Sequence, residues 1–206
     1  MTRSREWLVP LTGLGFVVLG ILSFVVIGEP KSADQPLQEI VDFYVDNKTA
    51  VEVGAAMGTL AGVLLVFFGA YLRRVLRAAA PDDEILSLAA FSGVLVVAIF
   101  SALDSMILFA AAEAAEDVDP VALQAMQAIW DNDFFVAVLG VELFLWATGI
   151  AALRTGALPK WLGWVMVVLA VIGMTPVGFV AAIGAALIVL GLSIWFAMRA
   201  RRPQTT

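Results

Sequence analysis

WLGWVMVVLAVIGMTPVGFVAAIGAALIVLGLSIWFAM, residues 161–198, is a stretch of 38 residues without one charged side chain. A helix needs about 20 apolar residues to cross the hydrocarbon of a bilayer, so this stretch is too long for one crossing. Thr175-Pro176-Val177-Gly178 interrupts it with residues that favour a tight turn. The stretch therefore predicts two membrane-spanning helices, at 161–174 and 177–198, joined by an outer turn.

The rest of the chain has the composition of a membrane protein. Of its 206 residues, 62% are hydrophobic, and the mean hydropathy is +0.97. A soluble domain is closer to half apolar and could not bury this much apolar surface. Four further apolar stretches predict spans at 7–27, 51–72, 85–112 and 133–153. The predicted fold class is all-α: one integral membrane domain over residues 1–206, a polytopic bundle of six transmembrane helices.

The charged residues alternate between the two sides of this predicted bundle. Two connections between spans are rich in acidic residues, and the net charge is −6. Basic residues mark the cytoplasmic side, so the pattern predicts a multi-pass protein of the plasma or bacterial inner membrane with both termini in the cytoplasm. Ten of the 12 basic residues lie near the chain ends or in the other two connections: Arg3, Arg5, Arg73, Arg74, Arg77, Arg154, Lys160, Arg199, Arg201 and Arg202.

Each acidic connection contains the pattern of a short amphipathic helix. In the first, apolar residues recur at helical spacing behind Pro36, namely Leu37, Ile40, Val41 and Tyr44. In the second, Asp119 is suited to cap a helix that begins at Pro120 and ends near Trp130. Two kinds of role stay open for these helices: covering the outer ends of the bundle, or binding a partner or acting as a lid.

The absence of Cys and His excludes several kinds of chemistry. Disulfides, thiolate or imidazole metal sites, His-ligated haem and Ser-His or Cys-His catalytic pairs all require one of these residues. We therefore expect no enzyme activity, no catalytic residues and no cofactor, while a metal site stays undetermined. The arginines indicate membrane anchoring and not nucleic-acid binding, so the lipid bilayer is the expected partner.

Asp104 and Glu142 are the acidic side chains placed deepest in the apolar stretches. Each lies nine residues from an acidic residue at the outer end of its span, Glu113 and Asp133 respectively. At 1.5 Å per residue this is a matching depth of about 13 Å. Because consecutive antiparallel spans tend to be neighbours, we expect the two carboxyl groups to face each other. With no basic residue in the spans, the pair forms a candidate proton or cation site.

A structural role is the alternative for this acidic pair. Both side chains would then stay neutral and hydrogen-bond to Ser101, Ser105 or Thr148 as links between helices. The residues alone do not decide between these two roles.

Three other acidic residues are weaker candidates for the site. Glu52 lies within one turn of the outer end of its span, where capping or snorkelling explains it better than lining a path does. Asp131 and Asp133 flank Asn132 and offer oxygen ligands for a divalent ion, but adjacent residues on a helix point in different directions.

Gly54, Gly58 and Gly62 repeat at four-residue spacing in the second predicted span. Small residues at this spacing let another helix approach closely, so they predict a helix-packing face. The partner helix belongs either to the same chain, or to a second copy or another membrane protein.

A further element, Leu153-Arg154-Thr155-Gly156-Ala157-Leu158-Pro159-Lys160-Trp161-Leu162-Gly163, together with Asp42-Phe43-Tyr44, resembles a group of small bacterial six-span membrane proteins classed as a domain of unknown function. The resemblance covers most of the chain and implies the same fold and compartment. It implies no activity, and any role that depends on the His found in the fourth span of many of those proteins does not transfer.

Two classes of function follow from these observations. One is a small proton- or cation-linked transport or permeation protein that uses Asp104 and Glu142. The other is a non-catalytic scaffold, sensor or accessory subunit that binds a partner through its outer helices or its glycine-rich face.

Overall fold

The computed structural model describes residues 3–81 and 84–201, and every regular element in these two ranges is a helix. The all-α fold class is thereby confirmed. Arg202, one of the basic residues used to predict topology, lies outside the described residues. The elements are the 3₁₀ helix η1 (Arg3–Leu8) and the α-helices α1 (Thr12–Ile27), α2 (Leu37–Asp46), α3 (Lys48–Ala79), α4 (Ile85–Ala114), α5 (Pro120–Trp130), α6 (Phe134–Thr155), α7 (Lys160–Gly173) and α8 (Phe179–Arg201).

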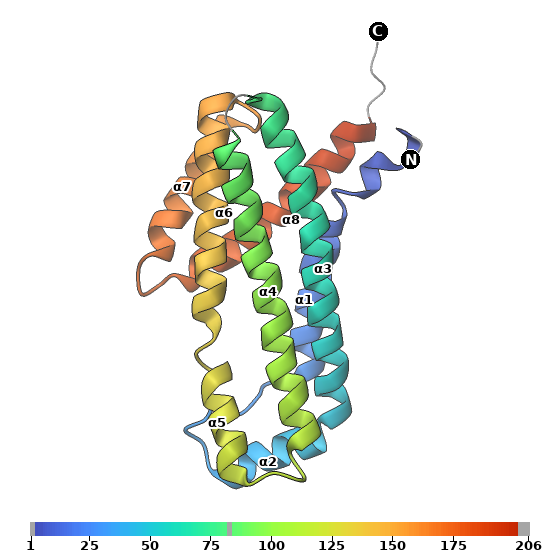
Figure 1. Cartoon of the computed structure of the whole chain (residues 1–206), viewed down its shortest axis with the longest axis vertical. Coiled ribbons are helices and arrows are strands. Elements are labelled where there is room, and N and C mark those ends of the chain that lie inside the picture. Colours follow the sequence, from blue (N-terminus) through green and yellow to red (C-terminus); the bar gives the residue numbers. More distant parts are fainter. Residues whose placement is uncertain (1–2, 82–83, 202–206) are drawn as a thin grey trace.

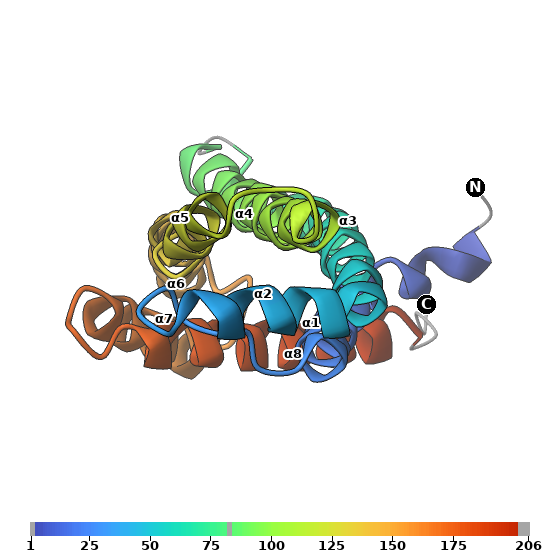
Figure 2. The same ribbon diagram turned by 90° about the horizontal axis from the view of Figure 1, so that it is seen from below.

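Three long helices form the centre of the bundle. α4 packs between α3 and α6, and α1 packs along α3 (Figure 1). Seen along the helices, α3, α4 and α6 form an arc, and α1 and α8 close it from the other side (Figure 2). The two ends of the bundle differ, because α2 and α5 cover one end and the connections that carry arginines lie at the other.

We call these two ends the cap end and the arginine end. The cap consists of α2, α5 and the loop 28–36. The arginine end carries the described basic residues of the connections and of the α8 terminus: Arg73, Arg74, Arg77, Arg154, Lys160, Arg199 and Arg201. η1 and the end of α8 both lie at the arginine end (Figure 1). There the guanidinium of Arg201 lies 3.7 Å from the ring centre of Trp7.

The prediction of six spans and two separate amphipathic helices is wrong. In the described residues five helical segments are long and apolar enough to cross a membrane, and one of them, Pro120–Thr155, includes α5 together with α6. The 14-residue α7 is too short, since it rises only about 21 Å against the roughly 30 Å of hydrocarbon. α7 starts at the arginine end and α8 returns there, so residues 174–178 turn well short of the cap (Figure 1).

Two of the other helices are longer than the sequence pattern predicted. α3 has 32 residues and α4 has 30, about 48 and 45 Å in length. On α3, the uncharged segment 53–72 accounts for about 30 Å, which matches the hydrocarbon. The charged first and last turns of α3 therefore project beyond it. Helical hydrogen bonding continues past the apolar segment because these turns can be solvated by water.

Glycines set how closely the central helices approach. A side chain at Gly93 would lie 2.5 Å from the backbone nitrogen of Phe144, and one at Gly140 would lie 2.8 Å from the backbone nitrogen of Val97. The backbones of α4 and α6 are therefore in direct contact at these four residues. This contact fixes the register of the two helices.

Candidate functional site

Asp104 and Glu142 do not face each other. The contact of Gly93 and Val97 with Gly140 and Phe144 places Glu142 level with residues 93–95 of α4. Asp104 lies at least nine residues further along α4, a separation of about 13 Å. The prediction of matching depth failed because it placed Glu113 and Asp133 at one level. α4 in fact continues more than two turns beyond the level of Asp133, up to the cap.

Asp104 lines a cavity of about 190 Å³ below the cap, between α1, α3 and α4. The wall is mostly apolar, and its hydroxyl groups belong to Ser23 and Ser101. Trp130, the last residue of α5, closes the cavity on the cap side. The cavity is large enough for a few water molecules, since one water needs roughly 30 Å³.

The hydroxyl groups of this cavity do not neutralise Asp104. Ser23 Oγ donates to the backbone oxygen of Gly54 and Ser101 Oγ donates to that of Gly58, each at 2.8 Å. The polar group beside the carboxyl is the indole N–H of Trp130. This N–H is buried and makes no hydrogen bond of standard geometry. Asp104 therefore keeps free capacity to accept a hydrogen bond or to hold a proton.

The surroundings of Asp104 on the cap side are acidic. Asp133 is close enough for the two charges to interact, and Tyr44 interacts with the charges of Asp104 and Asp131. Burial, followed by those two charges, raises the pKa of the Tyr44 phenol well above its usual range. Lys48, a basic residue of the cap end, is paired with Glu113 at 3.1 Å. A cation or proton entering from the cap would thus meet negative potential.

Asp131 has a structural role in the cap. Its Oδ2 accepts hydrogen bonds from the backbone nitrogen of Ala33 at 2.8 Å and from Ser32 Oγ at 3.1 Å. Its Oδ1 accepts one from Gln127 Nε2 at 2.9 Å, while Gln127 Oε1 accepts from Tyr44 Oη at 2.6 Å. These bonds join α2, α5 and the loop 28–36. Gln127 was missed in the sequence, although it follows the buried Leu123 by four residues and so lies on the inner face of α5.

The remaining weak candidates do not form a metal site. Glu52 lies beside the exposed pair of Lys48 and Glu113 at the cap end of α3. Asp133 has one buried carboxylate oxygen without a hydrogen-bond partner. Across residues 3–81 and 84–201, no group of three or more Asp and Glu residues is arranged to hold a metal ion.

Glu142 occupies a second and separate polar position. Both of its carboxyl oxygens are buried and make no hydrogen bond. Oε1 fills the space that a side chain at Gly173 would take, beside the turn between α7 and α8. The predicted partner Thr148 does not bond to it, since Thr148 Oγ1 is also buried without a partner. The nearby N–H is that of Trp146, whose geometry forms no hydrogen bond.

The glycine face of α3 packs inside the chain. Gly54 contacts Ile27 and the backbone of Ser23 on α1, while a side chain at Gly62 would lie 3.0 Å from the backbone oxygen of Ala98 on α4. Gly58, between them, would meet Ser105 Oγ at 2.6 Å. This face is therefore filled by α1 and α4, and it offers no surface to a second copy.

Comparison of the chain with protein-family models finds no match, and comparisons with curated proteins and with solved structures find no significant match. The apolar helices and their length define the class of the protein as a membrane-embedded helical bundle. No matching protein indicates a role for Asp104 and Glu142, so their role is inferred from their surroundings in the structure.

Proposed function

We propose that this chain is a small proton- or cation-linked transport or permeation protein of the cell membrane, with the arginine end in the cytoplasm, and that it catalyses no covalent chemistry. Asp104 and Glu142 act in it as two successive carboxyl positions instead of one pair. Asp104 is the position nearer the cap. Glu142 is the deeper position, beside the turn between α7 and α8.

The observation that carries this proposal is the unpartnered carboxyl group of Glu142. Buried polar groups almost always make hydrogen bonds, so a buried carboxyl whose two oxygens have none is costly to stability. The segment 134–153 that surrounds it contains no basic residue. A structural link between helices would need a partner, whereas a position that takes up and releases a proton or cation needs free oxygens.

The described conformation does not connect the two positions. Proton transfer between groups needs hydrogen-bond reach, about 2.6–3.2 Å, or a chain of water. Asp104 and Glu142 are about 13 Å apart along the helices, and the backbone contact of Gly140 with Val97 lies between their levels. Transfer of a proton or cation between Asp104 and Glu142 therefore requires water to enter between α4 and α6, or the hairpin of α7 and α8 to move away from Glu142.

Proton flux in liposomes tests the proposal. The purified chain is reconstituted with a pH-sensitive dye inside, and a membrane potential drives proton entry. We expect Asp104→Asn and Glu142→Gln each to lower the flux at least tenfold, because the amides keep hydrogen-bonding capacity but do not ionise. Glu29→Gln, which changes an exposed acid in the loop 28–36, is the control and is expected to retain full flux.

Cation-linked flux is measured in parallel by adding Na⁺ or K⁺ gradients at constant pH. If the wild-type chain shows no more proton or cation flux than empty liposomes, the transport proposal fails. The accessory-subunit alternative would then rest on the outer surfaces of α2 and α5, because the glycine face is already filled.

A further inference from the structure

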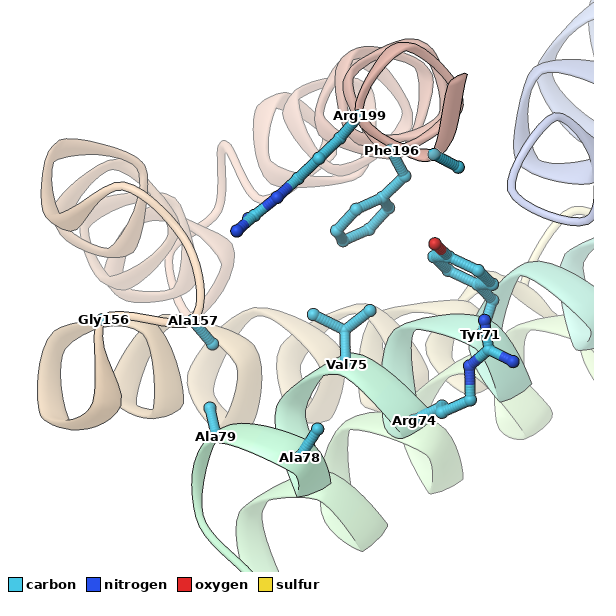
Figure 3. Close-up of a pocket in the computed structure, with 10 residues that line it drawn as sticks. Tyr71, Arg74, Val75, Ala78, Ala79, Gly156, Ala157, Phe196 and Arg199 are labelled. Carbon is cyan, nitrogen blue, oxygen red and sulfur yellow. The ribbon is translucent and has the colours of Figure 1, made fainter. Parts of the chain in front are cut away.

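A basic cavity of about 460 Å³ opens at the arginine end. It lies between the last turns of α3, the connection from α6 to α7 and the last turn of α8 (Figure 3). Arg74 and Arg199 come from opposite sides of the cavity, and the side chains of Val75 and Phe196 lie between them (Figure 3). Two guanidinium groups on either side of apolar side chains suit an anion attached to an apolar molecule.

Both arginines are available to such an anion. Among the residues whose side chains the structure describes, Arg199 pairs with no carboxylate, and its guanidinium lies 5.2 Å from the ring centre of Trp195. Arg74 contacts Glu6 at 3.6 Å, but both side chains are more than half exposed. Exposed ion pairs of this kind contribute little to stability, so a phosphate can replace Glu6 as the partner.

An apolar groove of about 570 Å³ begins beside this cavity, between α7 and α8. Trp161 and Trp195 line its end near the arginines, and Leu169 and Gly184 line its far end. Gly191 forms part of its floor, where an added side chain would meet no atom within 4 Å. The groove follows α7 and α8 for about 12 to 16 Å, which is one half of a hydrocarbon layer of roughly 30 Å.

The cavity and the groove are neighbours. Trp195 lines the groove, and the guanidinium of Arg199 lies over its ring. The next residue in the chain, Phe196, lines the cavity. On the opposite side, Ala157 of the cavity and Pro159 of the groove are two residues apart. A charged headgroup in the cavity can therefore continue into a chain in the groove.

We propose that the cavity and the groove together bind one anionic phospholipid of the leaflet at the arginine end. The phosphate lies in the cavity that Arg74 and Arg199 line, and one acyl chain lies along the groove. The shape of the groove favours a lipid over a free phosphate, because a free phosphate has no acyl chain to bind in an apolar groove that is one leaflet deep. This site is distinct from the acidic positions and does not depend on the proposed transport.

Native mass spectrometry of the full chain in detergent tests the site. The probes are phosphatidylglycerol and phosphatidylcholine with identical acyl chains, and inorganic phosphate. We expect phosphatidylglycerol to bind about tenfold more tightly than phosphatidylcholine, which corresponds to about 1.4 kcal/mol. Arg199→Gln and Arg74→Gln should abolish this preference, whereas Arg201→Gln, which changes an arginine outside the cavity, should retain it.

The groove has its own pair of variants. Gly191→Leu fills the floor of the groove and should weaken the binding of both lipids several-fold. Ala102→Leu adds the same side chain at an exposed position of α4 and should leave the binding of both lipids unchanged. Melting temperatures verify folding, and Arg74→Gln gives the charge test if Arg199→Gln does not fold. Equal binding of the two lipids overturns the proposal. It is also overturned if Arg201→Gln loses the preference for phosphatidylglycerol as fully as Arg199→Gln and Arg74→Gln do. Binding of inorganic phosphate with no effect of Gly191→Leu also overturns it, in favour of a free-phosphate site.

Discussion

Asp104 on α4 lies beside Asp133 at the start of α6, and not opposite Glu142. The contact of Gly93 with Phe144 imposes this register on the two helices. The deep acidic residues are consequently two separate positions along the bundle, each with its own surroundings.

The separation predicts that Asp104 and Glu142 titrate with weak coupling and not as one strongly coupled pair. At about 13 Å and an effective dielectric constant near 20, two unit charges interact by about 1.3 kcal/mol, equivalent to about one pK unit. Infrared titration of the protonated carboxyl band should therefore lose one component in Asp104→Asn, with the other shifted by no more than about one pH unit. A larger shift in the remaining component would show that the two groups form a coupled pair.

Alanine substitutions at three glycines should destabilise the protein to different extents, in an order set by the atoms that each added side chain meets. Gly93→Ala forces its side chain against the Phe144 backbone and should destabilise the bundle by about 2 kcal/mol or more. Gly58→Ala meets the end of the Ser105 side chain, which can rotate, so its cost should be smaller. Gly191→Ala meets nothing and should be neutral or stabilising by up to about 1 kcal/mol. Thermal unfolding in detergent measures the ranking, and equal melting temperatures for Gly93→Ala and Gly191→Ala would contradict the close contact of α4 and α6.

Tyr44→Phe should weaken the cap. The substitution removes the donor to Gln127 Oε1 and leaves a buried acceptor unpaired, at a cost of about 1–3 kcal/mol. Hydrogen exchange should then increase in α2 and α5 and stay unchanged in the α4 segment near Gly93. In the double variant Tyr44→Phe with Gln127→Met, part of this loss should be recovered, because both partners of the Tyr44–Gln127 bond are then apolar and only Asp131 Oδ1 loses a donor. Strict additivity of the two single changes would argue against the bond.

Stability should fall at alkaline pH through Tyr44. Its pKa is raised in the folded protein, so the unfolded chain releases the phenol proton first, near the ordinary value of about 10. The contribution of Tyr44 is therefore fully present below that pH and is lost as the pH rises above it. Melting temperatures measured between pH 8 and 11 should show this loss in the wild type and in Tyr71→Phe, and a smaller loss in Tyr44→Phe. An unchanged alkaline slope in Tyr44→Phe would assign the effect to other groups.

Cysteine labelling tests how far the hairpin of α7 and α8 extends. The chain has no Cys, so single substitutions report cleanly. In intact cells an impermeant reagent should label Ser32→Cys in the cap and fail to label Ala79→Cys at the arginine end. Thr175→Cys, in the turn between α7 and α8, should also resist labelling, because this turn stops well short of the cap (Figure 1). Strong labelling of Thr175→Cys would restore a sixth full crossing.

The sequence by itself determined the helices and most of their ends. Apolar length and the positions of charged residues account for the long helices, since both act within one segment. Local capping accounts for others: α5 starts at Pro120 behind Asp119, whose side chain accepts a hydrogen bond from the Val121 nitrogen at 2.8 Å. α2 and α7 likewise start directly after Pro36 and Pro159. These signals need no information from another part of the chain.

Only the tertiary structure decided how the helices are placed against each other. The register of α4 and α6 depends on Gly93 and Gly140 meeting across two segments that are 47 residues apart, so counting from the end of each helix misplaced Glu142. The depth of α7 depends on its contact with α6, where a side chain at Gly149 would lie 3.1 Å from the Gly163 backbone oxygen. Hydropathy is the same for a helix that crosses the bilayer and for one that turns back within it. The level at which a helix starts and ends along the bundle depends on the helices it packs against, and these contacts form only when the segments pack.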